Sequence, residues 1–167
     1  MARLRIALSQ PVFDLHGHFA KYKGKFEALL SAHYVAAAIL RDQELTLAQF
    51  EPKRYDDPKL RHLAERVEAR AEPQLRGAAA LVDIETISGE LFSARCDQPL
   101  GAPENRLSRA QIEDKFRTYA RGRLSQSHTD NVIDAVARLE QLASVRPLMD
   151  MLRVTQSAAP APVTVPA

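Results

Sequence analysis

The sequence predicts an α+β fold with two layers, in which a small, mostly antiparallel sheet is covered by helices. Short alternating segments, which are typical of strands, occur at the N-terminus and are grouped again in the middle of the chain. Longer segments with helical periodicity lie between and after them. The length of 167 residues is that of one domain with a core of its own.

The N-terminal part is predicted to form a strand followed by helices. Leu4, Ile6 and Leu8 alternate with less apolar residues, which is the period of a strand. Residues 9–24 show no sustained period, so we expect a loop there. Residues 26–41 are rich in Ala and Leu, and they predict one helix that is buried on more than one face.

The middle of the chain is predicted to contain a capped helix and three short strands. Asp57-Pro58 is a helix start, because an acidic N-cap precedes a proline in the first turn. Residues 67–71 alternate as a strand. Residues 79–87 and 90–95 are two further strand-like segments, and the Ser88-Gly89 pair between them indicates a hairpin.

The C-terminal part is predicted to be helical and to end in a tail. Ser108 and Gln111 have the spacing of a capping box, and a second helix is expected to open at residues 127–130. A last helical turn is expected near residues 148–152. Residues 154–167 contain no charge and three prolines, so the folded domain is predicted to span residues 1–153 and the tail to be disordered.

Composition restricts the classes of partner and compartment. The 23 basic and 21 acidic residues leave a net charge of +2, which does not favour nucleic acid or an anionic membrane. The lone Cys96 excludes an internal disulfide. No apolar segment approaches the roughly 20 residues that span a bilayer, and the N-terminus is a poor signal peptide. We therefore expect a cytoplasmic protein.

His33 and Tyr34 are the candidate site residues. They are neighbours in the predicted helix of residues 26–41, so their side chains should point about 100° apart. One of them could face a cleft while the other packs. The alternative is that both are core residues whose polar atoms have partners inside the protein.

The other candidate groups have simpler interpretations. His16 and His18 could be metal ligands, but no third ligand stands nearby, so we expect no metal. Asp83 and Glu85 share one face of a strand, which is more typical of a solvated sheet face. Lys115 is expected to be exposed. Phosphate-binding glycine loops and nucleophile elbows do not occur in the sequence.

Several short motifs, taken in order, resemble the C-terminal domain of the MmgE/PrpD family from about Leu4 to Leu152. That family includes 2-methylcitrate dehydratase and cis-aconitate decarboxylase. The matching motifs are the segment Ser31-Ala32-His33-Tyr34-Val35-Ala36-Ala37-Ala38, Leu47-x-x-Phe50, Asp57-Pro58-x-Leu60, the hairpin at Ser88-Gly89, the loop of residues 99–105, and Leu107-Ser108 leading to Lys115-Phe116.

The resemblance implies a cofactor-free lyase that acts on small polycarboxylates. In such enzymes a helical N-terminal domain supplies most catalytic groups, and the smaller α+β domain closes the cleft. The resemblance implies that Tyr34 contacts the substrate and that His33 packs behind it or orients it. Family members are commonly homodimers. The resemblance implies that this chain begins inside the second domain, so its expected partners are a helical N-terminal-type domain or a second copy.

Two functional hypotheses follow from the sequence. In the first hypothesis, the chain is the C-terminal lid domain of a split or truncated lyase that acts on small polycarboxylates such as 2-methylcitrate or cis-aconitate, and it is incomplete without the helical domain. The alternative is a stand-alone interaction domain or an inactive truncated remnant, because elimination needs a base and an acid that this sequence does not display together.

Overall fold

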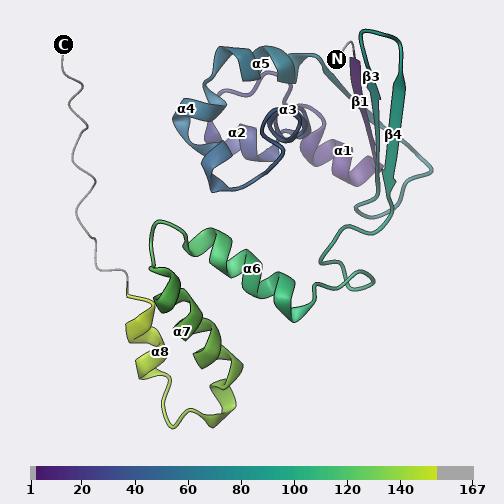
Figure 1. Cartoon of the computed structure of the whole chain (residues 1–167). Coiled ribbons are helices and arrows are strands. Elements are labelled where there is room, and N and C mark those ends of the chain that lie inside the picture. The colour runs from purple at the N-terminus through teal and green to yellow at the C-terminus, as the bar shows by residue number, and fades with distance from the viewer. Residues whose placement is uncertain (1–2, 154–167) are drawn as a thin grey trace, which may run out of the picture. The chain divides into compact units, whose positions relative to one another are not determined.

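The computed structural model describes residues 3–153 and divides the chain into two compact units, Met1–Arg106 and Leu107–Ala167 (Figure 1). The first unit holds a sheet and a group of helices, and the second holds helices. The tail predicted for residues 154–167 lies outside the described residues.

The first unit is built on a four-stranded sheet with the strand order β2-β1-β3-β4. Strand β1 pairs in parallel with β2 and antiparallel with β3, and β3 pairs antiparallel with β4. The bounds are β1 (Arg3–Leu8), β2 (Val67–Ala71), β3 (Ala80–Glu85) and β4 (Leu91–Cys96). The α+β class is confirmed. The sheet is mixed rather than mostly antiparallel, because the long helical connection between β1 and β2 returns the chain to the same end of the sheet.

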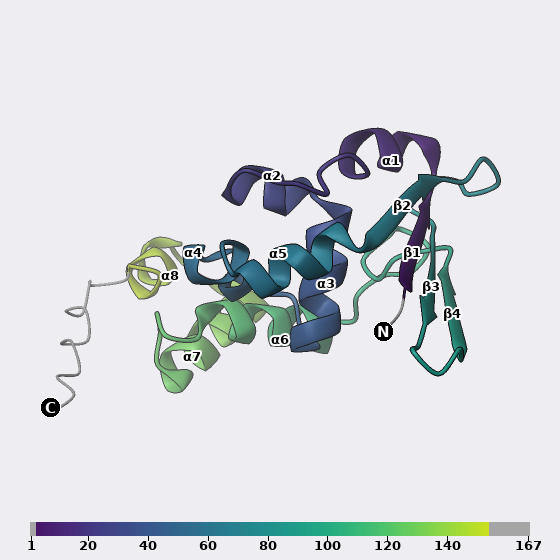
Figure 2. The same cartoon turned by 90° about the horizontal axis from the view of Figure 1, so that it is seen from above.

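Helices of the first unit lie on one side of the sheet in both views (Figures 1 and 2). The sheet and these helices form the two layers that the sequence predicted. The bounds are α1 (Gln10–His16), α2 (Lys25–Leu30), α3 (Ala32–Asp42), the 3-10 helix η1 (Leu47–Phe50), α4 (Pro52–Tyr55) and α5 (Pro58–Glu65).

Two predictions for residues 9–41 were wrong in detail. The expected loop contains α1, because a proline in the first turn suits a helix start after Ser9. The single expected helix is two helices, α2 and α3, which are separated at Ser31. That residue has an extended backbone, with φ −83° and ψ 110°, so helical hydrogen bonding restarts there.

The sheet has one apolar face and one charged face. Leu4, Ile6 and Leu8 are buried and pack with Val67, as their alternation predicted. On the opposite face, ion pairs join Arg3 and Arg5 of β1 to Glu68 of β2, and Arg5 to Glu85 of β3. The strand period therefore places Leu4, Ile6 and Leu8 on the apolar face and Arg3 and Arg5 on the other, where Ala7 is buried with Leu75 and Ala79.

The second unit is helical, with α6 (Arg109–Ala120), α7 (Gln126–Ala137), the 3-10 helix η2 (Leu139–Gln141) and α8 (Arg146–Met151). The predicted capping box at the start of α6 is confirmed, since Ser108 and Gln111 exchange both hydrogen bonds. Helix α7 begins earlier than predicted, because Ser125 caps it.

Candidate functional site

Ser31 positions both candidate residues at the start of α3. Its hydroxyl oxygen accepts a hydrogen bond of 3.0 Å from the backbone N–H of Tyr34. The same hydroxyl donates a 2.7 Å hydrogen bond to the carbonyl of Phe19. His33 and Tyr34 therefore occupy the first turn of α3, where the cap fixes the backbone.

Tyr34 is completely buried in the first unit, with 0% of its surface exposed. Its ring lies edge-on to that of Tyr22, with centroids 5.0 Å apart, and 5.7 Å from the ring of Phe50. Its hydroxyl donates a hydrogen bond to the backbone carbonyl of Gln49. These contacts are those of an aromatic core residue whose polar atom has a partner.

Gln49 is itself held in place by several partners, so the acceptor of Tyr34 is well ordered. Its side-chain oxygen accepts hydrogen bonds of 2.9 Å from the Thr46 backbone N–H and the Thr46 hydroxyl. Its amide nitrogen donates a 3.1 Å hydrogen bond to Asp42. Asp42 in turn forms an ion pair with Arg54, and this bond lowers the pKa of the Asp42 carboxyl. A hydrogen bond and an ion pair thereby connect α3, η1 and α4 around the Tyr34 hydroxyl.

Burial changes the acidity of both tyrosines in this cluster. Desolvation raises the pKa of Tyr34 to about 12, against a smaller lowering by Arg54. Desolvation likewise raises the pKa of Tyr22 to about 12, although the Arg61 guanidinium lies 4.7 Å from its ring centroid. Both phenols therefore keep their protons at neutral pH, and Tyr34 is a hydrogen-bond donor there.

His33 is the second candidate, and its environment differs from that of Tyr34. It is 5% exposed, and its Nδ1 atom is buried without a hydrogen-bond partner among residues 3–153. Burial, followed by the nearby His18, lowers the pKa of the imidazole. In a neutral imidazole one ring nitrogen donates a hydrogen bond and the other accepts one. Among residues 3–153 the His33 Nδ1 atom makes no such bond, whereas the Tyr34 hydroxyl does.

His16 and His18 lie at the C-terminal end of α1 and are used locally. The His16 Nδ1 atom lies 2.9 Å from the Leu30 carbonyl, so it carries the proton and donates. His18 packs edge-on to Phe13, with ring centroids 4.7 Å apart. Gly17 is required between them, because a Cβ atom there would lie 2.2 Å from the Phe13 ring. Between residues 3 and 153 no group of three or more possible ligands is arranged to hold a metal ion.

The remaining sequence candidates have surroundings of their own. Asp83 accepts a 2.7 Å hydrogen bond from Ser93, and Glu85 lies 3.8 Å from Arg5, both on the charged face of the sheet. Lys115 is exposed on α6 in the second unit. Asp83 and Glu85 therefore have partners of their own on the sheet, and His33 and Tyr34 are neighbours along α3.

The sequence analysis missed the residues that hold the tyrosine hydroxyl. Gln49 acts through its backbone carbonyl, which every residue has, so no side-chain signal could have identified it. Asp42 and Arg54 are separated by 12 positions and meet only because the chain turns back after α3. Ser31 was inside the quoted motif, and its spacing from Tyr34 is that of an N-cap.

Chemically, the arrangement supplies one protonated phenol and one neutral imidazole on adjacent residues. Comparison with known proteins gives this pair a context. The model of the MmgE/PrpD C-terminal domain matches residues 1–141, which include the whole Tyr34 cluster. The chain belongs to the MmgE/PrpD family. The resemblance of the short motifs to this family is thereby confirmed.

Curated relatives of this MmgE/PrpD chain include mammalian enzymes. It is 29% identical to cis-aconitate decarboxylase of Homo sapiens over 131 aligned residues. These residues make up 76% of this chain and 27% of the relative. It is 28% identical over 131 residues to cis-aconitate decarboxylase of Mus musculus, with the same coverage of 76% and 27%. The chain spans about a quarter of the length of the curated relatives it matches.

Among residues 3–153, the structure contains no helix with the length and apolar composition of a membrane span.

Proposed function

We propose that this chain is the lid domain of a cofactor-free MmgE/PrpD lyase that acts on a small polycarboxylate in the cytoplasm. Cis-aconitate and 2-methylcitrate are the first substrates to test. The observation that carries the proposal is the family match over residues 1–141 together with relatives named for a decarboxylase. We further propose that a helical MmgE/PrpD N-terminal-type domain completes the active site.

The chemistry explains why a second domain is needed in this proposal. Loss of water or CO₂ from a polyacid requires a base near the proton, an acid near the leaving group and donors on the carboxylates. In the first unit, the Tyr34 hydroxyl is buried and already donates to Gln49. His33 is nearly buried and has a lowered pKa, which suits an uncharged neighbour rather than a carboxylate clamp.

Tyr34 is the residue that we propose contacts the substrate, with His33 packed behind it. Because the Gln49 carbonyl covers the hydroxyl, substrate contact requires the η1 segment to move away. The hydroxyl would then exchange its bond to the carbonyl for a bond to a substrate oxygen. A pKa of about 12 keeps the phenol protonated for that donation at neutral pH.

The proposal is tested by co-expressing the chain with a helical MmgE/PrpD N-terminal domain from the same genome. We expect a stable complex by size-exclusion chromatography. We also expect the complex to decarboxylate cis-aconitate or dehydrate 2-methylcitrate, and each component alone to be inactive. Failure to form a complex, together with no turnover of either substrate, would contradict the proposal.

Tyr34→Phe in that complex tests the role of the hydroxyl. If the hydroxyl donates to the substrate, turnover per folded complex should fall on the order of 100-fold. The free energy of unfolding should fall by about 1 to 2 kcal/mol, because the Gln49 carbonyl loses its donor. The control is Tyr119→Phe, which removes a hydroxyl from an exposed position on α6. A stability loss without loss of turnover would leave Tyr34 a core residue only.

One observation favours a second candidate, a stand-alone interaction domain. Several large apolar side chains on α6 and α7 are exposed, including Ile112 at 55% and Val136 at 54%. An interaction domain would bind through such a surface without turning over a polyacid. The activity measurement on the co-expressed complex distinguishes the two candidates.

A further inference from the structure

One carboxylate oxygen near Tyr34 joins three elements of the first unit. The Asp42 Oδ2 atom, at the end of α3, accepts a hydrogen bond from the Arg54 guanidinium of α4. The same oxygen accepts a 3.1 Å hydrogen bond from the Gln49 side-chain amide of η1. The Gln49 backbone carbonyl is in turn the acceptor of the Tyr34 hydroxyl. The Asp42–Arg54 ion pair is therefore connected to that hydroxyl through Gln49.

The position of η1 over Tyr34 depends on the Gln49 side chain. The η1 segment has four residues, so its own hydrogen bonds supply little stability. The Gln49 side chain bonds both the Thr46 backbone and Asp42, and Gln49 is only 4% exposed. A buried amide that loses its acceptor is costly, so η1 becomes easier to move when Asp42 turns away. The ion pair that orders Asp42 therefore orders η1 as well.

Two ion pairs act on the Tyr34 phenol. Asp42 pairs with Arg54, and the adjacent Arg41 pairs with Asp57 at 2.6 Å. Among these charges, Arg54 has the largest effect on the pKa of Tyr34. The two positive and two negative charges cancel, so an anion next to the phenol gains a counter-charge only by replacing a carboxylate on an arginine. A carboxylate ligand can do so, because it offers a guanidinium the same acceptor oxygens as Asp42.

Of the two arginines, Arg54 is the one whose partner also holds η1. The Arg54 side chain is 25% exposed, so an anion can reach it from solvent. The partner of Arg41 has a different second contact, because Asp57 caps α5 by accepting a 2.8 Å hydrogen bond from the Lys59 N–H. Replacing Asp57 on Arg41 would therefore not release Gln49, whereas replacing Asp42 on Arg54 would.

We propose that Arg54 is a carboxylate-binding residue whose occupation by the substrate uncovers Tyr34. One carboxylate of the polycarboxylate replaces Asp42 on the guanidinium. Asp42 and Gln49 then lose their fixed arrangement, and η1 moves away from the Tyr34 hydroxyl. An anion that binds the open form better shifts the chain toward that form, so binding and uncovering are coupled. The choice of a polycarboxylate as the anion rests on the proposed function.

Hydrogen–deuterium exchange of the chain, followed by mass spectrometry, measures the opening of η1. The Glu51 N–H donates to the Ala48 carbonyl and the Thr46 N–H to the Gln49 side chain, so residues 46–51 report on this segment. We expect cis-aconitate to accelerate exchange there, by about tenfold at about ten times its dissociation constant from the open form. Sodium chloride at the same ionic strength is the reference. Equal exchange in both solutions would overturn the proposal.

Substitution of Arg54 separates anion binding from a purely structural role. Arg54→Gln removes the charge, so exchange at η1 should no longer respond to cis-aconitate, whereas Arg54→Lys should keep part of the response. The matched control is Arg41→Gln, which breaks the neighbouring ion pair but leaves the partners of Gln49 in place, and it should respond as the wild type does. A response that persists in Arg54→Gln would overturn the proposal.

Asp42→Asn gives a prediction of the opposite sign. The substitution removes the carboxylate that competes for Arg54, so cis-aconitate should bind at least about tenfold more tightly in a titration followed by NMR. A merely structural ion pair would give no such gain. Circular dichroism establishes that each variant is folded, and the titration of Asp42→Asn decides where Arg54→Gln is not. Unchanged or weaker binding by Asp42→Asn would overturn the proposal.

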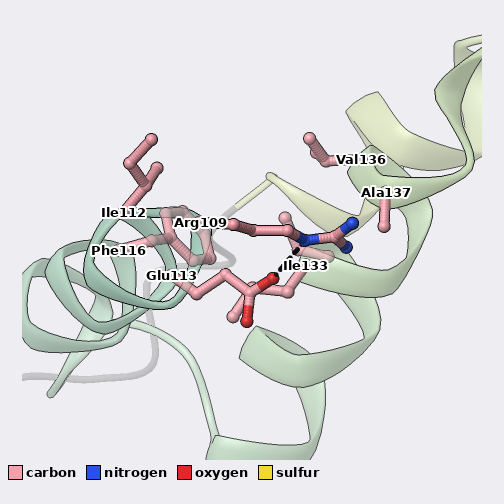
Figure 3. A pocket seen from close by; sticks show the side chains of 8 residues that line it. Arg109, Ile112, Glu113, Phe116, Ile133, Val136 and Ala137 are labelled. Atoms are coloured by element: carbon pink, nitrogen blue, oxygen red, sulfur yellow. Dashed lines mark hydrogen bonds and ion pairs between the residues drawn. The ribbon is translucent and has the colours of Figure 1, made fainter. Parts of the chain in front are cut away.

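An ion pair of the second unit controls for unspecific anion binding. Arg109 pairs with Glu113 at 2.8 Å beside an apolar groove that α6 and α7 line (Figure 3). The Arg109 side chain is 70% exposed, which makes it more accessible to anions than Arg54. Because its partner is Glu113 and not Asp42, Arg109→Gln should leave the response of η1 unchanged. Loss of the response in this variant would overturn the assignment to Arg54.

These measurements use the chain alone, so they are separate from turnover by the co-expressed complex. Opening of η1 by cis-aconitate without turnover in the complex would contradict the proposed function and support the role of Arg54. Turnover in the complex without opening of η1 would support the proposed function and overturn the role of Arg54.

Discussion

At the scale of single residues, Tyr34 and His33 differ in how their polar atoms are satisfied. The Tyr34 hydroxyl donates to the Gln49 carbonyl, whereas His33 Nδ1 is buried with no partner in the described part of the chain. A buried polar atom without a partner is costly, and the cost rises further if the group becomes charged. His33 is therefore where a change of pH should act on the first unit.

We predict that His33 destabilises the fold in acid. Burial and His18 lower its pKa below the usual value of 6.5, so the unfolded chain takes up the proton first. The contribution of His33 to stability is complete above pH 6.5 and is lost progressively as the pH falls toward its folded pKa. Urea unfolding between pH 8 and pH 5 should show a falling free energy of unfolding, with a shallower fall in His33→Gln.

The His33 imidazole can also be followed directly. Its ring proton resonances should titrate below pH 6.5 in the folded protein by NMR. A midpoint at or above that value, or an identical pH dependence of stability in wild type and His33→Gln, would contradict the prediction.

At the scale of elements, the division of residues 25–42 into α2 and α3 decides where the candidate residues lie. An unbroken helix would place His33 and Tyr34 in its middle. The break instead puts them in the first turn of α3, beneath a buried serine cap. The helical period is the same in both cases, so the break depends on the contacts of Ser31 and not on the apolar pattern.

We predict that Ser31→Ala lowers the free energy of unfolding by about 1 to 3 kcal/mol. The substitution removes the acceptor of the Tyr34 N–H and the donor to the Phe19 carbonyl, both at a position with 0% exposure. Urea denaturation followed by circular dichroism provides the measurement. The control is Ser88→Ala in the exposed β3–β4 turn, with an expected change within about 0.5 kcal/mol. Equal effects of the two substitutions would show that the cap contributes nothing particular.

At the scale of the whole molecule, the chain distributes its buried surface unevenly. The first unit has a cluster around Tyr34 and Phe50, a second on the apolar sheet face and a third around Leu75. In the second unit, the described residues form a small cluster around Val132. Stability of a compact unit grows with the apolar surface that it buries, so the two units should not be equally stable alone.

We predict that a fragment of residues 1–106 folds alone and that a fragment of residues 107–153 does not at low concentration. The first carries most of the buried apolar residues, and the second leaves Ile112 and Val136 exposed to water. Thermal unfolding by circular dichroism should be cooperative for the first fragment and gradual for the second. Cooperative unfolding of residues 107–153 as a monomer would contradict the prediction.

Much of the fold was predictable from local patterns. The alternation in β1, the Asp57-Pro58 helix start, the hairpin at Ser88-Gly89 and the capping box at Ser108 all depend on residues close in sequence. The α1 helix was missed because its seven residues bury no side chain and so show no clear period. The direction of β2 was missed because strand polarity depends on how the chain returns to the sheet.

The sequence by itself determined the family, the α+β class and the identity of His33 and Tyr34 as neighbours, because these follow from local patterns and motif order. Only the tertiary structure decided what surrounds them. The Gln49 carbonyl lies 15 positions from Tyr34 along the chain, and Asp42 lies 12 positions from Arg54. Such pairings arise when separate elements pack on one another, and the free energy of burial, rather than any local spacing, selects which backbone and side-chain groups meet.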